Sequence, residues 1–389
     1  MTQKVFDIII VGAGPAGLLA GRTLIKNSCG NILLLDKYAP WERTVPCAEG
    51  VGKLGFHEGA SPIHPSWIRH EVTSATFHAP GGSSITYTDK YGGYIIDRTR
   101  MQRDIADELA SRGASCHFGQ RVVAIEPQLN GIRAVRTADG NSFPGRVVID
   151  ASGPITRFGS TERIQVKHDD LEPAYFVWAD NVSLPSDHIH IYAGQHIAPG
   201  GYTWAFPRGE GGANIGIVLG RAQKRQENIR NLLEAFINRH YHGAHIVQRF
   251  AGPIPCAHQR TLPMATAGLI KAGDCASTVN PISRAGISEA MLSGQLAAQA
   301  ACRMLDASSP KERTAAARMY EREWNQRRGN RHRKLSRVKN SLRSIPDADY
   351  DSGARTLSAI PQSEMTMSKI FRASLSRFPR LVWALRHLM

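Results

Sequence analysis

The sequence predicts an α/β protein: a parallel sheet with crossover helices, interrupted by an antiparallel β-rich insertion and followed by a helical C-terminal extension. Two apolar runs, residues 6–11 and 31–35, flank a helical pattern over 15–26 and form a βαβ unit of ordinary size. Residues 170–256 have mostly strand patterns, with one helix expected near 223–239. After this stretch the sequence again shows a strand pattern followed by a long helical pattern, residues 287–305. We therefore expect the β-rich stretch to be an insertion in the α/β fold.

Length, charge and cysteine content narrow the class of protein. The chain has 389 residues, more than one hydrophobic core usually organises, so we expect two lobes and an extension. The formal net charge of +15 favours anionic partners such as phosphate-bearing cofactors, acidic lipid surfaces or acidic proteins. The six cysteines form no CxxC pair, which predicts no metal site and reduced thiols in a cytoplasmic protein. No run reaches 18 apolar residues, so no membrane-spanning helix is expected.

A glycine turn joins the first strand to the first helix. Gly12, Gly14 and Gly17 follow the Gly-x-Gly-x-x-Gly pattern of dinucleotide-binding folds, and Asp36 ends the second strand. The first glycine permits the tight turn, the second lets the backbone approach a pyrophosphate, and the third lets the helix pack on the strand. We expect Asp36 to accept hydrogen bonds from a ribose hydroxyl. A second match at residues 50–55 follows no predicted strand, so we place it in a flexible loop near the cofactor.

Two later turns favour FAD over NAD as the dinucleotide. A buried strand over 147–151 ends at small residues that include Gly153, and Gly273-Asp274 precedes a helix that starts near Ile287. Asp274 is expected to bind a ribityl or ribose hydroxyl. The positive N-terminus of this helix suits the negative charge of a reduced flavin. The sequence therefore predicts a Rossmann-like FAD-binding domain.

The expected domains follow from these elements. The FAD-binding domain is predicted to be discontinuous, with the β-rich substrate-binding domain between its parts and a basic helical region after it. The predicted FAD-binding residues are 1–75, 95–158 and 260–305; the β-rich residues are 76–94 and 159–259; the C-terminal region is 306–389.

One segment narrows the prediction to a family. Residues 199–207, PGGYTWAFP, match the pattern P-x-x-Y-x-W-x-F-P. With the three turns, this segment resembles the geranylgeranyl reductase family of FAD-dependent oxidoreductases, and the resemblance covers residues 5 to about 305. It implies that the segment is a strand beside the flavin and lines a cavity for an isoprenoid chain. It also implies that residues 46–50, PCAEG, form a cysteine-containing loop near the isoalloxazine.

The resemblance also implies site residues. Tyr202, Trp204 and Phe206 alternate on the strand, so they share one face and are expected to bind substrate. Cys47, Tyr202 and Trp204 are the expected catalytic residues, with Cys47 affecting proton delivery or substrate fit. The expected FAD contacts are Gly12, Gly14, Pro15, Ala16, Gly17, Asp36, Lys37, Cys47, Ala48, Arg98, Val122, Gly153, Asp274, Gly286 and Ile287.

Two departures from the family pattern concern the flavin site. The family commonly shows N-P-x-x-G-G-G-I, whereas Arg284 and Ala285 replace two of the glycines here. Either this loop has a different shape, or Arg284 supplies positive charge near the flavin or a substrate anion. Gln102 stands where relatives often have an aspartate.

The resemblance implies an FAD-dependent reductase that saturates double bonds of a polyprenyl lipid by hydride transfer from reduced flavin. NAD(P)H and ferredoxin both remain open as electron donors. One alternative is an FAD-dependent monooxygenase acting on an apolar or aromatic substrate. Another is a membrane-associated flavoprotein that passes electrons to quinone.

The C-terminal region is strongly basic. Residues 327–343 contain a run of arginine and lysine without stacking aromatics, which is more typical of a solvated face than of a nucleic-acid site. Residues 369–389 mix arginine with aromatic and aliphatic side chains. This mixture favours peripheral contact with an anionic membrane on its inner face, and packing on the protein itself is the alternative.

Overall fold

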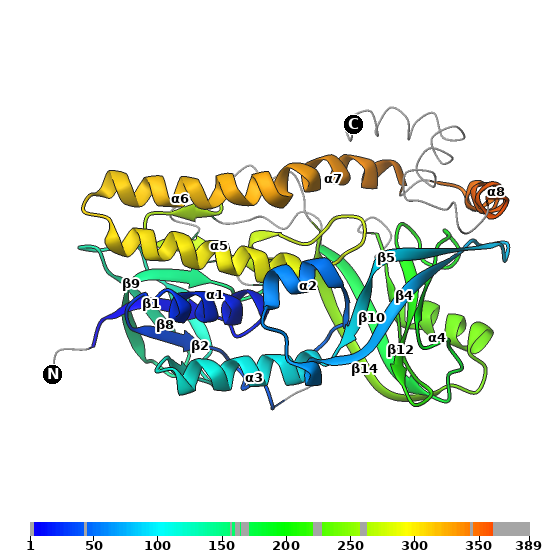
Figure 1. Cartoon of the computed structure of the whole chain (residues 1–389), viewed down its shortest axis with the longest axis horizontal. Helices are drawn as coiled ribbons and strands as arrows, with labels where there is room; N and C mark the ends of the chain where they lie inside the picture. The colour runs from blue at the N-terminus through cyan, green and yellow to red at the C-terminus, as the bar shows by residue number, and fades with distance from the viewer. Residues whose placement is uncertain are drawn as a thin grey trace.

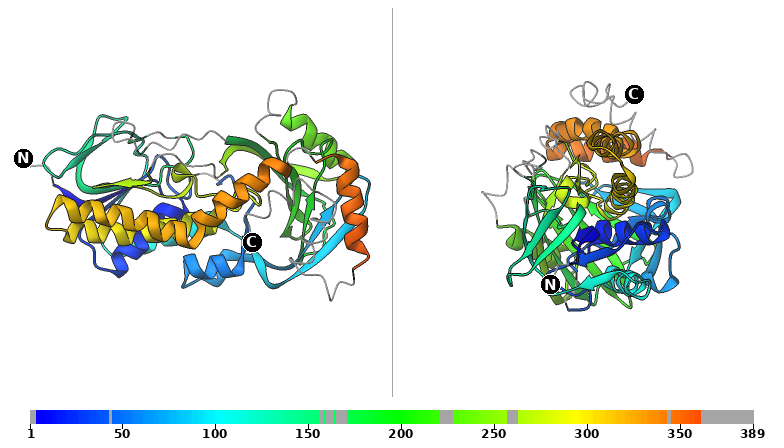
Figure 2. Two further views of the ribbon diagram at one scale, coloured as in Figure 1. Left: turned by 90° about the horizontal axis from the view of Figure 1, so that it is seen from above. Right: turned by 90° about the vertical axis from the view of Figure 1, so that its left-hand side faces the viewer.

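The computed structural model describes residues 4–42, 45–155, 158–159, 164, 171–220, 228–256, 263–342 and 345–360. Within them, two β-sheets lie side by side along the long axis of the molecule, and helices cover one edge of both (Figures 1 and 2). The predicted α/β architecture with an inserted β-rich unit and a helical extension is confirmed.

The first sheet has a parallel centre. Its strand order is β15-β16-β9-β1-β2-β6, with β7 and β8 attached through β9. Its central strand β1 pairs in parallel with β2 and β9, and all three run through the core, as expected of parallel strands covered on both faces. The strands are β1 (Phe6–Val11), β2 (Ile32–Leu35), β6 (Ser115–His117), β7 (Val122–Ile125), β8 (Arg133–Thr137), β9 (Ser142–Asp150), β15 (Ala265–Thr266) and β16 (Leu269–Lys271).

Three helices pack on one face of this sheet: α1 (Pro15–Lys26), α3 (Arg98–Ser111) and α5 (Ile287–Asp306). Small residues let α1 and α5 approach each other closely. A Cβ atom added to Gly294 of α5 would lie 2.0 Å from the carbonyl oxygen of Ala16 in α1. The N-termini of both helices therefore lie at the same end of the first sheet.

The second sheet forms the other lobe. Its order is β14-β10-β13-β12-β11-β4-β5-β3, and α4 (Ile229–His240) packs on one of its faces. The opposite face carries a cluster of aromatic side chains. The strands are β3 (Gly50–Gly52), β4 (Ile68–His78), β5 (Ser84–Ile96), β10 (Leu171–Asp180), β11 (His188–Tyr192), β12 (Tyr202–Gly209), β13 (Gly212–Val218) and β14 (His245–Pro255).

Two local expectations differ from the structure. The second glycine pattern is not a loop, because residues 50–52 form β3, which pairs with β5, and Lys53–Ala60 form α2. Gly50 suits this strand because an added Cβ would lie 2.9 Å from the ring of Phe206. The second sheet also begins at Gly50, with β3, earlier than the expected residue 76, while the domain boundaries themselves remain a proposal.

The C-terminal region continues from α5 as an antiparallel helical layer (Figure 1). Helix α6 (Pro310–Trp324) runs back along α5, a π-helical turn η4 (Asn325–Gly329) follows, and α7 (Asn330–Leu342) extends over the second sheet. Asp347–Ser358 form α8, which packs against β5. The expected membrane-contact segment 369–389 lies outside the described residues.

The expectation of reduced thiols is wrong for one pair of cysteines. Cys29, just after α1, and Cys302, near the end of α5, form a disulfide with a Cα–Cα distance of 5.6 Å. They are 273 residues apart in the sequence, so only the packing of α1 on α5 brings them together. Cys47, Cys116, Cys256 and Cys275 are free thiols.

Candidate active site

The glycine turn is closely packed except where a ligand would approach. Cβ atoms added to Gly12 and Gly17 would lie 2.4 Å and 1.9 Å from backbone oxygens of Ala151 and Gly12. At Gly14, by contrast, an added Cβ would meet nothing within 4 Å. The first and third glycines therefore hold the turn together, and the second leaves open space at the N-terminus of α1, which suits a pyrophosphate.

Asp36 connects the glycine turn to the end of β2. Its carboxylate accepts hydrogen bonds from the backbone N–H groups of Ala13 at 2.6 Å and Tyr38 at 2.9 Å. A hollow of about 390 Å³ lies beside it, lined by Lys37, Tyr38 and Arg121. The predicted FAD contacts Lys37 and Val122 thus lie on segments that meet at this end of the sheet, where the adenosine part of FAD would fit.

The two later turns lie against the glycine turn. The backbone of Ala151, which precedes Gly153, contacts Gly12, and Gly273 packs against Ala16. Gly153 has a φ of +90°, and a Cβ added there would meet nothing within 4 Å. The arrangement brings three parts of the chain that are more than 100 residues apart around one open region.

Asp274 and Arg98 face this region from opposite elements. Burial raises the pKa of Asp274, and the positive charge of Arg98 at the start of α3 partly offsets the rise. Gln102 accepts a hydrogen bond from Arg98 Nε at 2.9 Å and donates one to the carbonyl of Ala13 at 3.2 Å. The residue that departs from the family pattern therefore joins α3 to the glycine turn.

These residues fit FAD. The open space at Gly14 and Gly153 lies where its pyrophosphate and linker would pass, and Asp274 is a partly buried carboxylate that can accept hydrogen bonds from its hydroxyl groups. Gly286 is the N-cap of α5 and makes no side-chain capping hydrogen bond, so no cap at this position competes with a ligand for the first backbone N–H groups of the helix. These backbone N–H groups would face the flavin ring.

The aromatic face of the second sheet adjoins this region. Tyr202, Trp204 and Phe206 lie on one face of β12, as their alternation predicted, and Trp204 is buried. Gly216 on β13 makes room for the indole, because a Cβ added there would lie 2.2 Å from Trp204. Phe176 and Phe250 extend the same face with rings stacked at 4.7 Å.

Asn214 is a site residue that the sequence analysis missed. Its Oδ1 accepts a hydrogen bond from Trp204 Nε1 at 2.9 Å, and its Nδ2 donates to the carbonyl of Cys47 at 2.9 Å. It is fully buried in β13. It therefore fixes both the indole and the cysteine loop, a role that no local sequence pattern indicates.

The cysteine loop carries a buried carboxylate. Glu49 is 3% exposed and pairs with Arg208 Nε at 3.1 Å. Burial raises the pKa of Glu49, and Arg208 partly counteracts the rise. The Arg208 guanidinium in turn lies 3.5 Å from the centre of the Trp178 ring. This cluster closes one end of the aromatic face.

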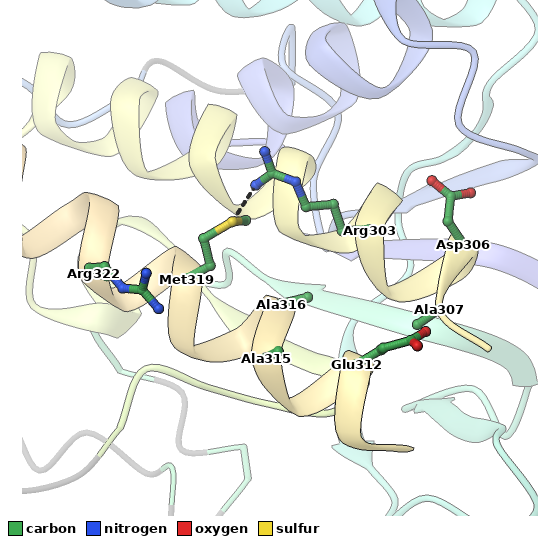
Figure 3. Close-up of a pocket in the computed structure, with 8 residues that line it drawn as sticks. All are labelled: Arg303, Asp306, Ala307, Glu312, Ala315, Ala316, Met319 and Arg322. Carbon is green, nitrogen blue, oxygen red and sulfur yellow. Dashed lines mark hydrogen bonds between the residues drawn. The ribbon is translucent and has the colours of Figure 1, made fainter. Parts of the chain in front are cut away.

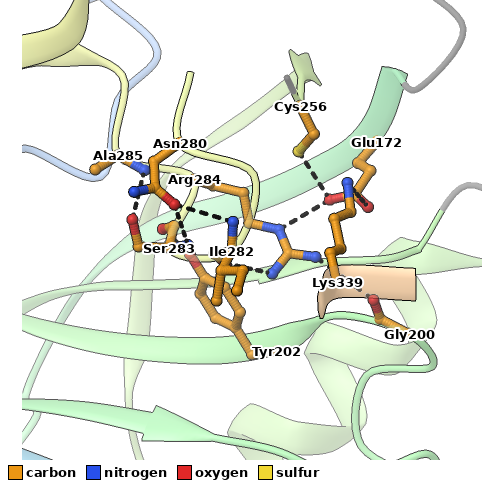
Figure 4. A network of polar contacts seen from close by, with 10 residues as sticks. All are labelled: Glu172, Gly200, Tyr202, Cys256, Asn280, Ile282, Ser283, Arg284, Ala285 and Lys339. Atoms are coloured by element: carbon orange, nitrogen blue, oxygen red, sulfur yellow. Dashed lines mark hydrogen bonds and ion pairs between the residues drawn. The ribbon is translucent and has the colours of Figure 1, made fainter. Parts of the chain in front are cut away.

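A second buried ion cluster closes the opposite end (Figure 4). Glu172 of β10 pairs with Arg284 Nε and with Lys339 Nζ of α7, each at 2.8 Å. Its carboxylate also accepts a hydrogen bond from the thiol of Cys256 at 3.1 Å. Burial alone would raise the pKa of Glu172, but Arg284 and Lys339 outweigh it and lower the pKa. The positive charge of Arg284 is therefore paired with a carboxylate of the protein itself, that of Glu172.

Tyr202 links the aromatic strand to the loop that precedes α5 (Figure 4). Its hydroxyl donates to the carbonyl of Ser283 at 2.7 Å, and the Arg284 guanidinium lies 4.8 Å from its ring centre. Burial raises the pKa of Tyr202 to about 12. Arg284 adopts a left-handed φ of +55°, a conformation that favours glycine, the residue the family commonly has at this position.

Another hollow lies outside this region. It has a volume of about 490 Å³ between α5 and α6 and is lined by charged and apolar side chains such as Arg303, Glu312 and Met319 (Figure 3). It is far along α5 from the glycine turn and offers no nucleophile. Within the described ranges, no cluster of residues could hold a metal ion, and no helix is long and apolar enough to cross a bilayer.

Comparisons with known proteins identify the family. Residues 170–254 match the model described as the geranylgeranyl reductase catalytic domain, and residues 7–169 match the lycopene cyclase protein model. The chain is 30% identical to a digeranylgeranylglycerophospholipid reductase from Methanothrix thermoacetophila, over 98% of this chain and 99% of that protein. A similarly named protein of Methanococcoides burtonii is 28% identical over 98% of this chain and 95% of its own length.

Solved structures of similar proteins have the same fold as this chain. A geranylgeranyl bacteriochlorophyll reductase-like protein from Thermoplasma acidophilum is 25% identical, covers both chains fully and superposes with a TM-score of 0.88. A flavin-dependent brominase, 18% identical over 96% of this chain and 100% of its own, has a TM-score of 0.68 and shares the fold alone. The chain belongs to the geranylgeranyl reductase family and is an FAD-dependent oxidoreductase.

Proposed function

We propose that the protein reduces carbon–carbon double bonds in the geranylgeranyl chains of a digeranylgeranyl glycerophospholipid. The names of its full-length relatives support this lipid class. The observation that carries the proposal is the hydrogen bond between the Tyr202 hydroxyl and the Ser283 carbonyl, 2.7 Å. It joins the aromatic strand to the loop in front of α5, and so sets an apolar wall beside the flavin.

The protein's own residues would bind and orient the lipid chain. The hydride for one alkene carbon would be supplied by reduced FAD when it is bound. The aromatic face of β12 would hold the chain in a water-excluded position, which an unactivated alkene requires because it is a poor hydride acceptor. Asn214 holds Trp204 and the backbone of Cys47 in fixed positions. We therefore retain Cys47, Tyr202 and Trp204 as proposed catalytic residues and Phe206 as a substrate contact.

The proton for the second alkene carbon is proposed to come from the Cys47 loop. The hydroxyl hydrogen of Tyr202 is already donated to Ser283, so its transfer would break the bond that positions the strand. Cys47 has a free, partly buried thiol whose sulfur accepts a hydrogen bond from the Glu49 backbone N–H at 3.2 Å. Because the sulfur is the acceptor in this contact, the thiol hydrogen is not used by it and remains available for transfer to the alkene carbon.

The electron donor and the site of action are part of the proposal. Arg331, Arg333 and Arg337 are exposed on α7, which contains no acidic residue. This cationic helix favours contact with the anionic inner surface of a membrane, where the lipid substrate resides. NAD(P)H and ferredoxin are both retained as proposed donors, and a cytoplasmic, peripheral location is proposed.

The reduction itself is directly testable. Protein loaded with FAD and reduced by dithionite without oxygen is expected to convert a digeranylgeranyl glycerophospholipid into products heavier by two hydrogens per saturated bond. Mass spectrometry of the extracted lipid checks this result. Substrate hydroxylation when oxygen is supplied would instead favour the monooxygenase alternative, and quinone reduction without any gain in lipid mass would favour the electron carrier. Either result contradicts the proposal.

The FAD site has a separate test in Gly14→Ala. The added methyl has room in the protein alone, so it should cause no clash in the FAD-free form. It would overlap the pyrophosphate, and overpacking of this kind costs about 1–3 kcal/mol, which corresponds to about 5- to 150-fold weaker FAD binding. Fluorescence titration with FAD measures the affinity. The control is Gly353→Ala in α8, where an added Cβ also has open space. Equal FAD affinities of the two variants would contradict binding of the pyrophosphate at Gly14.

A further inference from the structure

The π-helical turn η4 lies over the first turn of α5. Glu289 is the third residue of α5, is 8% exposed, and carries the one acidic side chain in that turn. Arg328 of η4 approaches it with Nε at 3.3 Å from Oε2, and His332 of α7 with Nε2 at 3.8 Å from Oε1. A carboxylate and a guanidinium are thus held together at the first turn of α5, the end of the helix that would face the flavin.

The surrounding groups hold Arg328 in this position. Glu58 of α2 accepts a hydrogen bond from Arg328 Nη2 at 2.5 Å and lies 3.4 Å from Arg327. On the other side, the buried ring of Trp324 packs edge-on against His332. Gly329 permits the π-helical turn, because a Cβ there would lie 2.4 Å from Asn325 Oδ1 and 3.1 Å from the Trp324 ring. The turn sets Arg328 and His332 four residues apart, on one face toward α5.

The sign of the charges matters for the flavin. The N-terminus of a helix carries a positive potential equivalent to about half a charge, which stabilises negative charge on a reduced flavin. A buried carboxylate in the first turn would cancel that potential unless a cation lies against it. Arg328 provides this cation from a different element of the chain.

We propose that Arg328 is a positioning residue that neutralises Glu289 and thereby raises the reduction potential of FAD bound at the N-terminus of α5. The proposal rests on FAD binding with its ring toward Ile287, and not on the identity of the lipid. A purely structural role, in which the ion pair only attaches the C-terminal helices to α5, predicts a loss of stability with no change in potential.

The experiment measures the midpoint potential of the FAD-loaded protein by spectroelectrochemical titration. Arg328→Gln should lower the ratio of reduced to oxidised FAD at a fixed potential about tenfold, which equals about 30 mV for a two-electron couple. Glu289→Gln should shift the ratio in the opposite direction by a similar factor. The double variant should return close to the parent value.

The matched control is Arg303→Gln. Arg303 pairs with Glu323 between α5 and α6 at the other end of α5, so its loss should leave the potential unchanged. Unchanged potentials in Arg328→Gln and Glu289→Gln, or shifts of the same sign in both, would overturn the proposal. If Arg328→Gln fails to fold, Glu289→Gln still decides it, because it removes no cation. A protein that binds FAD with the expected shifts but leaves lipids unreduced would contradict only the proposed function.

Discussion

Replacing Glu172 with glutamine is expected to lower the free energy of unfolding by about 3–5 kcal/mol. Glu172 is fully buried and is the shared partner of Arg284 and Lys339, which are 8% and 4% exposed in their side chains. The substitution keeps the shape of the side chain but leaves these two cations without the carboxylate. Urea denaturation at neutral pH, followed by circular dichroism, measures the loss.

The pH dependence of this effect has a defined sign. The folded-state pKa of Glu172 is lowered from 4.5, so its stabilisation is complete above pH 4.5 and is lost as the pH falls through the lower folded-state value. The difference between parent and Glu172→Gln should therefore shrink under acidic conditions. Glu234→Gln, which breaks an exposed pair with Arg230, is the control and should unfold like the parent. A Glu172→Gln effect no larger than this control would mean that the cluster contributes no net stability.

Removing the Cys29–Cys302 disulfide by the double substitution Cys29→Ser and Cys302→Ser is expected to cost about 2–5 kcal/mol. The bond closes a loop between residues 273 positions apart, and a long loop restricts the unfolded chain strongly. Denaturation of the oxidised parent and of the double variant, without reductant, gives the difference.

Two controls accompany this experiment. Cys116→Ser replaces a free, partly buried thiol and should respond to reductant as the parent does. The parent treated with dithiothreitol should approach the stability of the double variant. Identical unfolding of the parent with and without dithiothreitol would contradict a contribution from the disulfide.

The sequence predicted those parts of the site that are built from contiguous segments. The glycine turn, the Gly153 turn and the Gly273-Asp274 turn each combine a buried strand with small residues, and their chemistry is local. The three turns follow parallel strands, β1, β9 and β16, and parallel strands end at the same edge of a sheet, so the turns meet there. The alternation of Tyr202, Trp204 and Phe206 likewise predicted their common face, because side chains of a strand alternate by geometry.

The contacts between distant segments could not be predicted in this way. Asn214 and Cys47 are 167 residues apart, and Glu172 and Lys339 come from the inserted sheet and the C-terminal helices. The sequence around a single asparagine or glutamate in a strand does not indicate which distant residue its side chain will contact. The departure at Arg284 was visible in the sequence, but its consequence depended on Glu172 facing it across the two lobes.

The helical rod formed by α6, η4 and α7 has a mechanical consequence. One end of it packs along α5, and the other end is held to the second sheet by the ion pair of Lys339 with Glu172. The helical rod is about 50 Å long and therefore spans both lobes. Because the helical rod is attached to both lobes, it resists rotation of one lobe against the other. Such a rotation would have to deform this helical segment or break the ion pair between Lys339 and Glu172.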